Sequence, residues 1–123
     1  MRFSVVVPVY NVAEYLAKCL DSLLPALSEE DEVILSLGNS ADRSSEIAAE
    51  YAERYSSIKL VWQKGRGLSD ARNCALEAAS GDYIICVDSD DYVETEILCK
   101  LLARMRKENW QFDVVVHDFR RLE

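Results

Sequence analysis

The sequence predicts an α/β protein of three layers, in which helices cover both faces of a mostly parallel sheet. Short β-branched runs alternate with longer stretches whose apolar residues have helical spacing, in the order β-α-β-α-β-α-β-α-β. Strands that alternate with helices of this length form a parallel sheet, in which the connections are right-handed crossovers. The chain has 123 residues, of which 50% are hydrophobic, so we expect a single domain, residues 1–123, around one core.

Five apolar runs predict the strands of this sheet. The first, Phe3–Val9, is β-branched and nearly all apolar, as expected for a strand that is covered on both faces. The fourth, residues 82–87, is expected to be a buried strand that ends at a group of acidic residues. The other three runs are Glu32–Leu37, Ile58–Trp62, which we place more laterally in the sheet, and residues 112–116.

Four helices are predicted between the strands. Asp42 or Ser44 is expected to cap the second helix, since both side chains can accept a hydrogen bond from a free backbone N–H. The third helix has a face of small side chains, which allows close approach to the sheet, and Gly81 is expected to end it in the left-handed conformation. The apolar stripes that mark the four helices lie within residues 13–24, 47–55, 68–79 and 97–105.

The charge balance limits the possible partners of the chain. It carries 14 basic and 22 acidic residues, for a formal net charge of −8. This argues against binding to nucleic acid or to an anionic membrane through general electrostatics. A phosphate-bearing ligand would therefore need local basic groups.

The cysteines and the apolar runs indicate a cytoplasmic protein. The cysteines are far apart, form no C-x-x-C pair and fall within apolar periodic segments, so we expect reduced core residues. No apolar run is long enough to span a bilayer, and Met1 and Arg2 lead directly into a strand rather than a signal-peptide core. The four cysteines are Cys19, Cys74, Cys86 and Cys99.

Three carboxylates fall within four residues at the end of the fourth predicted strand, where the sequence reads D-S-D-D. Such close like charges repel one another, unless a hard cation lies between them and takes its oxygen ligands from them. Asp88, Asp90 and Asp91 therefore predict a site for a divalent cation, Mg²⁺ or Mn²⁺. The alternative is that Asp90 or Asp91 caps the following helix.

The loops after the first, second and fourth strands share one edge of such a sheet, where ligands bind. An exposed Tyr10 could stack on a planar base, and Asn11 offers both senses of hydrogen bond. Alternatively, Asn11 caps the first helix with Tyr10 packed beneath it. Arg72 on the third helix, with Lys64 or Arg66 before it, could meet a diphosphate, although such basic residues are also common on solvated surfaces.

Two common nucleotide-binding motifs are absent from the sequence. The first strand is followed by neither G-x-G-x-x-G nor a Gly-rich loop ending in Lys-Ser/Thr, so the dinucleotide and P-loop classes are excluded. A response-regulator receiver would need its acidic pair after the first strand, whereas here the acidic residues follow the fourth.

Three motifs in order resemble the inverting family 2 glycosyltransferases over nearly the whole chain. Residues 5–11 read V-V-V-P-V-Y-N and are similar to the opening strand and turn of that family. Residues 67–73 read G-L-S-D-A-R-N and resemble its G-x-S-x-A-R-N helix start. Residues 81–91 read G-D-Y-I-I-C-V-D-S-D-D and look like its region around the D-x-D motif. The resemblance implies the Rossmann-like, nucleotide-binding half of a GT-A fold.

The resemblance also implies roles for individual residues. Asp88 and Asp90 would be the acids of the D-x-D motif, with Asp88 near the ribose and the metal and Asp90 a metal ligand. Asp91 would be a neighbour of the metal site. The reaction implied moves a sugar from a nucleoside-diphosphate donor to an acceptor hydroxyl, of a saccharide or lipid-linked glycan, with inversion at the anomeric carbon. The residues expected around the nucleotide are Pro8, Tyr10, Asn11, Asn39 and Arg72.

Two departures from the family pattern affect what we expect of this chain. Where the family has D-D-G-S-T-D after the second strand, residues 37–42 read L-G-N-S-A-D, so the acidic pair, which includes the residue that reads the base, is missing. Asn39 could offer hydrogen bonds in their place. The family's acceptor site and general base lie in a further stretch of chain, and no residue here matches that base. His117 and Asp118 are interpreted as strand-end residues.

We therefore expect a truncated glycosyltransferase, the donor-binding portion, that binds a nucleotide with a metal and turns over little alone. The alternative is a non-catalytic remnant or partner-binding module of the same fold. A third possibility is that a partner chain or self-association as a homo-oligomer supplies the missing half. The truncated sheet edge and the surface left by the absent half would be apolar and exposed, which predicts an oligomer.

Overall fold

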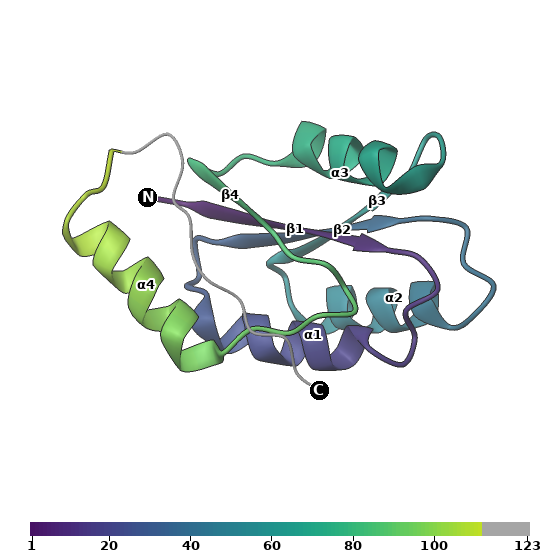
Figure 1. The fold of residues 1–123 in the computed structure, drawn as a ribbon, viewed down its shortest axis with the longest axis horizontal. Coiled ribbons are helices and arrows are strands. Elements are labelled where there is room, and N and C mark those ends of the chain that lie inside the picture. The colour runs from purple at the N-terminus through teal and green to yellow at the C-terminus, as the bar shows by residue number, and fades with distance from the viewer. Residues whose placement is uncertain (112–123) are drawn as a thin grey trace.

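The computed structural model describes residues 1–111, and its centre is a four-stranded parallel sheet (Figure 1). Its strands lie in the order β3-β2-β1-β4, so β3 is lateral as predicted. β2 and β3 lie on one side of β1 and β4 lies on the other, so the order of the strands reverses at β1. The crevice outside the carboxyl ends of the strands at such a switch point is the usual ligand site of open parallel sheets. The strand predicted at residues 112–116 lies outside the described residues. The strands are β1 (Phe3–Val9), β2 (Glu32–Leu37), β3 (Ile58–Trp62) and β4 (Tyr83–Cys86).

Helices cover both faces of the sheet, which confirms the predicted three-layer α/β/α arrangement. In Figure 1, α3 lies over one face and α1 and α2 lie against the other, while α4 contacts the short 3-10 helix η1. Within the part of the chain that the structure describes, no helix is both long and apolar enough to cross a lipid bilayer. The helices are α1 (Leu16–Leu23), η1 (Leu24–Ala26), α2 (Ser44–Arg54), α3 (Gly67–Ala78) and α4 (Thr95–Lys107).

The central strand β1 is buried along its whole length because its side chains enter two different clusters. Val5 and Val7 pack in the cluster that includes Leu20 of α1. Val6 points to the other face, where it packs with Ala75 of α3. Burying one such aliphatic side chain contributes about 1.5–3 kcal/mol, so both helix layers hold β1 in place.

The amino-terminal edge of the sheet is held by a buried carboxylate. Glu32 is 1% exposed, and its Oε1 forms ion pairs with Lys59 Nζ at 2.7 Å and Arg2 Nη2 at 3.1 Å. Its Oε2 accepts hydrogen bonds from Ser4 Oγ at 2.6 Å and from the Ser80 N–H at 2.6 Å. Burial alone would raise the pKa of Glu32, but these partners, Lys59 first, lower it to about 2. Three strands and the segment before β4 are thus joined through one side chain.

The strand β4 differs from the buried strand that the sequence predicted. Its residues alternate between partly buried and exposed, and Ile84 is 40% exposed, because Ile84 and Cys86 lie on the face of Val6, which α3 covers over β1 and β2 but hardly over β4. Cys86 on β4 and Cys99 on α4 are exposed as well, so the prediction that all four cysteines are core residues was wrong for these two. Ile97, at the start of the predicted stripe on α4, is also exposed.

Gly81 does not adopt the left-handed conformation that the sequence predicted. Among the described glycines only Gly67, at the start of α3, has a positive φ, of 87°. A Cβ atom on Gly81 would lie 2.5 Å from Ser4 Oγ, 2.8 Å from the Ser4 nitrogen and 2.9 Å from the Arg2 oxygen. The glycine is therefore required for the close approach of the segment before β4 to the start of β1.

Candidate functional site

A cavity of about 850 Å³ lies at the carboxyl ends of β1, β2 and β3. It is bounded by the loops that follow these strands, by the start of α3 and by the loop after β4, as the shared edge in the sequence prediction requires. Two large aromatic side chains on its wall are mostly exposed, Tyr10 at 61% and Trp62 at 63%. The polar and basic residues on the wall are Asn39, Gln63, Arg66, Asp88, Ser89 and Asp90.

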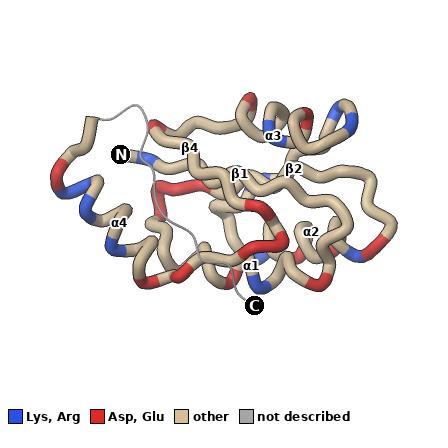
Figure 2. The backbone as a smooth tube through the Cα atoms, in the orientation of Figure 1, with Lys and Arg blue, Asp and Glu red and all other residues tan. Residues whose placement is uncertain are grey.

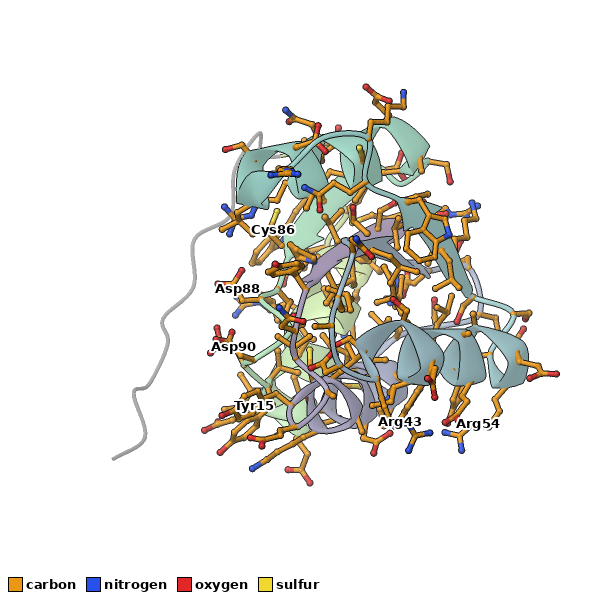
Figure 3. All side chains as sticks on the ribbon, turned by 90° about the vertical axis from the view of Figure 1, so that its right-hand side faces the viewer. Tyr15, Arg43, Arg54, Cys86, Asp88 and Asp90 are labelled. Atoms are coloured by element: carbon orange, nitrogen blue, oxygen red, sulfur yellow. The ribbon has the colours of Figure 1, made fainter. Side chains whose placement is uncertain are left out.

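The acidic residues after β4 converge at one side of this cavity. One carboxylate oxygen from each of Asp88, Asp90 and Asp91 lies within 4.8 Å of the other two, and all three side chains are exposed. Figure 2 shows this acidic stretch directly after β4, and Figure 3 shows Asp88 and Asp90 on the same edge of the molecule. Oxygen atoms grouped in this way suit Mg²⁺ or Mn²⁺, which prefer carboxylate ligands.

The electrostatics of the acidic group fit a cation site better than a helix cap. Partial burial raises the pKa of Asp91, and the negative charges of Asp90 and Asp88 raise it further. A cation between the carboxylates would remove this repulsion. The helix α4 begins at Thr95, with Glu94 as its N-cap and no side-chain hydrogen bond at the cap. Neither Asp90 nor Asp91 therefore caps α4, and that alternative is excluded.

Pro8 and Ser89 determine where the acidic loop leaves the sheet. The pairing of β1 with β4 ends at Val6↔Cys86, followed by a hydrogen bond from the Val87 N–H to the Val6 carbonyl at 3.0 Å. Pro8, two residues further along β1, has no N–H to continue the ladder. Its carbonyl instead accepts a hydrogen bond from the buried Ser89 hydroxyl at 2.6 Å. Asp88 and Asp90 flank this buried serine and are exposed, in a turn closed by a hydrogen bond from the Asp91 N–H to the Asp88 carbonyl at 3.0 Å.

Arg72 reaches the acidic loop from α3. Its Nη2 donates a hydrogen bond to Asp88 Oδ1 at 3.1 Å, and the side chain is partly exposed. Arg72 Nε is buried and has no hydrogen-bond partner among the described residues. Lys64 points elsewhere, because its Nζ pairs with Glu77 Oε2 at 3.4 Å, whereas Arg66 is on the cavity wall. Among the described guanidinium groups, Arg66 therefore lies on the cavity wall and Arg72 contacts the acidic loop.

Asn11 joins the loop after β1 to the loop after β2. It adopts a left-handed φ of 51°, its N–H donates to Ser40 Oγ at 3.0 Å, and its Oδ1 accepts from the Ala41 N–H at 2.8 Å. Asn11 therefore does not cap α1, and it is not on the cavity wall. Asp42 continues this connection, since its Oδ2 accepts from the Ala13 N–H at 3.0 Å and its Oδ1 from the N–H of Ser44 at 3.0 Å, at the start of α2.

Tyr10, directly after β1, lies where the sequence analysis predicted it, but two of its neighbours on the cavity wall were not predicted. Tyr10 is exposed on the cavity wall, so the alternative that it packs beneath Asn11 was wrong. Pro8, Asn39, Asp88 and Asp90 also line the cavity, while Arg72 joins them through Asp88. Trp62 and Gln63 were not predicted as site residues. Their position directly at the carboxyl end of a predicted strand is the signal that could have identified them.

The fold is that of a Rossmann-like α/β domain of the GT-A type. The chain belongs to the family described as Glycosyl transferase family 2, whose sequence profile matches residues 4–122. It is 41% identical over 112 residues to the uncharacterized glycosyltransferase EpsJ of Bacillus subtilis. The aligned region covers 91% of this chain and 32% of that protein. The chain thus spans about a third of the length of this relative.

Solved structures show the same fold. The S. aureus protein TarS, residues 1–349 in complex with UDP-GlcNAc, superposes with a TM-score of 0.76 at 32% identity, over 89% of this chain and 32% of that one. The mannosyltransferase PcManGT of Pyrobaculum calidifontis, in complex with GDP-Man and Mn²⁺, superposes with a TM-score of 0.70 over 80% of this chain and 31% of that one. At 24% identity, the second likeness shows the fold alone.

Proposed function

We propose that this chain binds the nucleoside-diphosphate sugar donor of an inverting glycosyltransferase, with a divalent cation held by Asp88 and Asp90. The observation that carries the proposal is the convergence of carboxylate oxygens, within 4.8 Å of one another, beside a cavity walled by exposed aromatic rings. The rings suit a base and the carboxylates suit a metal that binds phosphate oxygens. The TarS complex with UDP-GlcNAc supports a donor of this class.

The positions of the side chains support the contact that we propose for each of them. Tyr10 would stack on the base, with Pro8 and Asn39 beside the nucleoside. Asp88 would lie near the ribose and the metal, and Asp90 would be a metal ligand. Arg72 would hold Asp88 and present positive charge to the diphosphate, at 3.1 Å from the carboxylate. A bound divalent cation would neutralise the charge that develops on the departing diphosphate.

The acceptor half of the reaction is proposed to lie outside the described residues. Among residues 1–111, no His, Asp or Glu other than the acidic loop lies on the cavity wall, so none is placed to deprotonate an acceptor hydroxyl. We propose a saccharide or lipid-linked glycan as the acceptor and a cytoplasmic location, which the four free cysteines support. Activity would require the stretch of chain that the longer relatives possess.

Calorimetric titration of UDP into the chain, with and without Mn²⁺, tests the proposal. We expect saturable binding only when the metal is present, and loss of that binding in Asp90→Asn. Glu53→Gln is the charge-matched control, because Glu53 is exposed on α2 and away from the cavity. Metal-independent binding, or binding that survives in Asp90→Asn, would refute the proposed site.

One observation favours a non-catalytic partner-binding module as a second candidate. Leu37 and Gly38 stand where the family has its acidic pair. Leu37 is 1% exposed within the main core cluster, and Gly38 has no side chain, so neither side chain can accept a hydrogen bond from a base. Among the described residues, the Ile84 side chain on β4 is 40% exposed and offers an apolar contact for a second copy of the chain. Light scattering that gives a stable dimer, together with no heat from any nucleotide, would favour this candidate.

A further inference from the structure

Gln63 is the first residue after β3, and both its backbone and its side chain are held in place. Its N–H donates to the Leu37 carbonyl at 2.9 Å, and its side-chain Nε2 donates to the Gly67 carbonyl at 2.8 Å. Because a carbonyl oxygen can only accept, the second bond fixes which end of the amide is nitrogen. The acceptor atom Oε1 therefore points away from Gly67, and Gln63 is on the cavity wall.

The contacts around Gly38 show where this acceptor lies. A Cβ atom on Gly38 would be 3.2 Å from Gln63 Oε1 and 3.0 Å from Tyr10 Cδ1. The amide oxygen and the tyrosine ring thus flank the same backbone position at the end of β2. No hydrogen bond to Oε1 occurs among the described residues. Since Gly38 has no side chain, a directed acceptor is left open beside an exposed aromatic ring.

We propose that Gln63 reads the nucleobase by accepting a hydrogen bond from a ring N–H. This inference rests on the proposed function, because it names the base that the donor nucleotide carries. Uracil has a ring N–H at N3 and guanine has one at N1, and either can donate to Oε1. Cytosine N3 and adenine N1 are acceptors, so their lone pairs would repel that of Oε1, and these bases could donate to it only through their exocyclic amino groups. The site therefore favours uracil or guanine nucleoside diphosphates over those of cytosine and adenine.

The other polar side chain near the base position cannot make this distinction. Asn39 is exposed, and its side chain forms no hydrogen bond among the described residues. Its amide can therefore turn either its donor or its acceptor end toward a base. Gln63 cannot turn in this way without breaking its 2.8 Å bond to Gly67. Selection thus falls to Gln63 alone of these two amides.

Competitive titrations of UDP, GDP, CDP and ADP with Mn²⁺ test this inference in the wild-type chain and in Gln63→Leu. We expect the wild type to bind UDP and GDP about tenfold more tightly than CDP and ADP, which corresponds to one well-placed hydrogen bond and one avoided repulsion. In Gln63→Leu this ratio should fall to about twofold or less. Gln111→Leu is the matched control, because Gln111 is exposed beyond α4 and away from the cavity.

The outcomes separate this inference from the proposed function. A wild-type chain that binds CDP as tightly as UDP would refute the role of Gln63 while leaving the metal-dependent nucleotide site intact. A Gln63→Leu variant that keeps the wild-type ratio would do the same. A wild-type chain that is folded by circular dichroism but binds none of the four nucleotides would refute the proposed function, and this inference with it.

Discussion

Replacing Glu32 by Gln removes the charge of the buried carboxylate that joins β1, β2 and β3 while keeping the size of the side chain. The fall in its pKa from the ordinary 4.5 to about 2 corresponds to about 3 kcal/mol of stability at neutral pH, at about 1.4 kcal/mol for each pH unit. Lys59 and Arg2 are half-exposed, so water can solvate them once the carboxylate is gone. We expect Glu32→Gln to lower the free energy of unfolding by about 2–3 kcal/mol.

The pH dependence of this effect distinguishes a charge contribution from a packing contribution. Because the folded-state pKa of Glu32 lies below the unfolded one, its contribution is complete above about pH 4.5 and is lost as the pH falls toward about 2. Urea unfolding of both proteins at several pH values measures it, with Glu53→Gln as the control. The wild-type and Glu32→Gln curves should converge at acid pH. A difference that is below about 0.5 kcal/mol at neutral pH, or that does not change with pH, would refute the reasoning.

Three further predictions concern residues that position the site. Gly81→Ala should lower the free energy of unfolding by about 1–3 kcal/mol in urea titrations, because its Cβ would collide with the backbone at the start of β1, at 2.8 Å from the Ser4 nitrogen and 2.9 Å from the Arg2 oxygen. An unchanged midpoint would contradict this. Ser89→Ala leaves the Pro8 carbonyl without its donor, so we expect a loss of about 1–3 kcal/mol and weaker Mn²⁺ binding, and unaltered metal affinity would count against it. Gly38→Ala should displace Tyr10 and Gln63 and weaken UDP binding about three- to tenfold by calorimetry, while the free energy of unfolding changes by less than about 0.5 kcal/mol. A variant with wild-type UDP affinity would show that these side chains do not contact the base.

The three strands with the strongest apolar patterns were predicted at their observed bounds, Phe3–Val9, Glu32–Leu37 and Ile58–Trp62. In β1 and β2, which are buried along their whole length, local propensity and tertiary burial favour the same state, so the pattern alone is enough, whereas β3 is only partly buried. The strand β4 is also apolar in sequence, but α3 hardly covers one of its faces, which leaves half of its side chains exposed. Burial of a strand depends on its neighbours in space, and the local sequence of β4 does not indicate which elements these are.

The candidate site was predicted only where its residues stand in recognisable local patterns. The acidic loop was found because three carboxylates in four residues are costly without a counter-charge. Gln63 was missed because its role depends on two contacts, with Gly67 and with the space over Gly38, that appear only once β2 and β3 are paired. Gly81 was assigned to the wrong cause for the same reason, since its neighbour in space is Ser4 on β1.

Electron paramagnetic resonance of Mn²⁺ in the presence of UDP tests the central claim most directly. With UDP in excess, the free Mn²⁺ signal should fall until about one metal ion is bound per chain, because Asp88 and Asp90 provide one site. With the double variant Asp88→Asn, Asp90→Asn, the free Mn²⁺ signal should equal that of a sample that contains the same UDP and Mn²⁺ but no protein. The Mn²⁺ held by UDP itself is then the same in both samples. Equal metal binding by the wild type and the double variant would contradict the account.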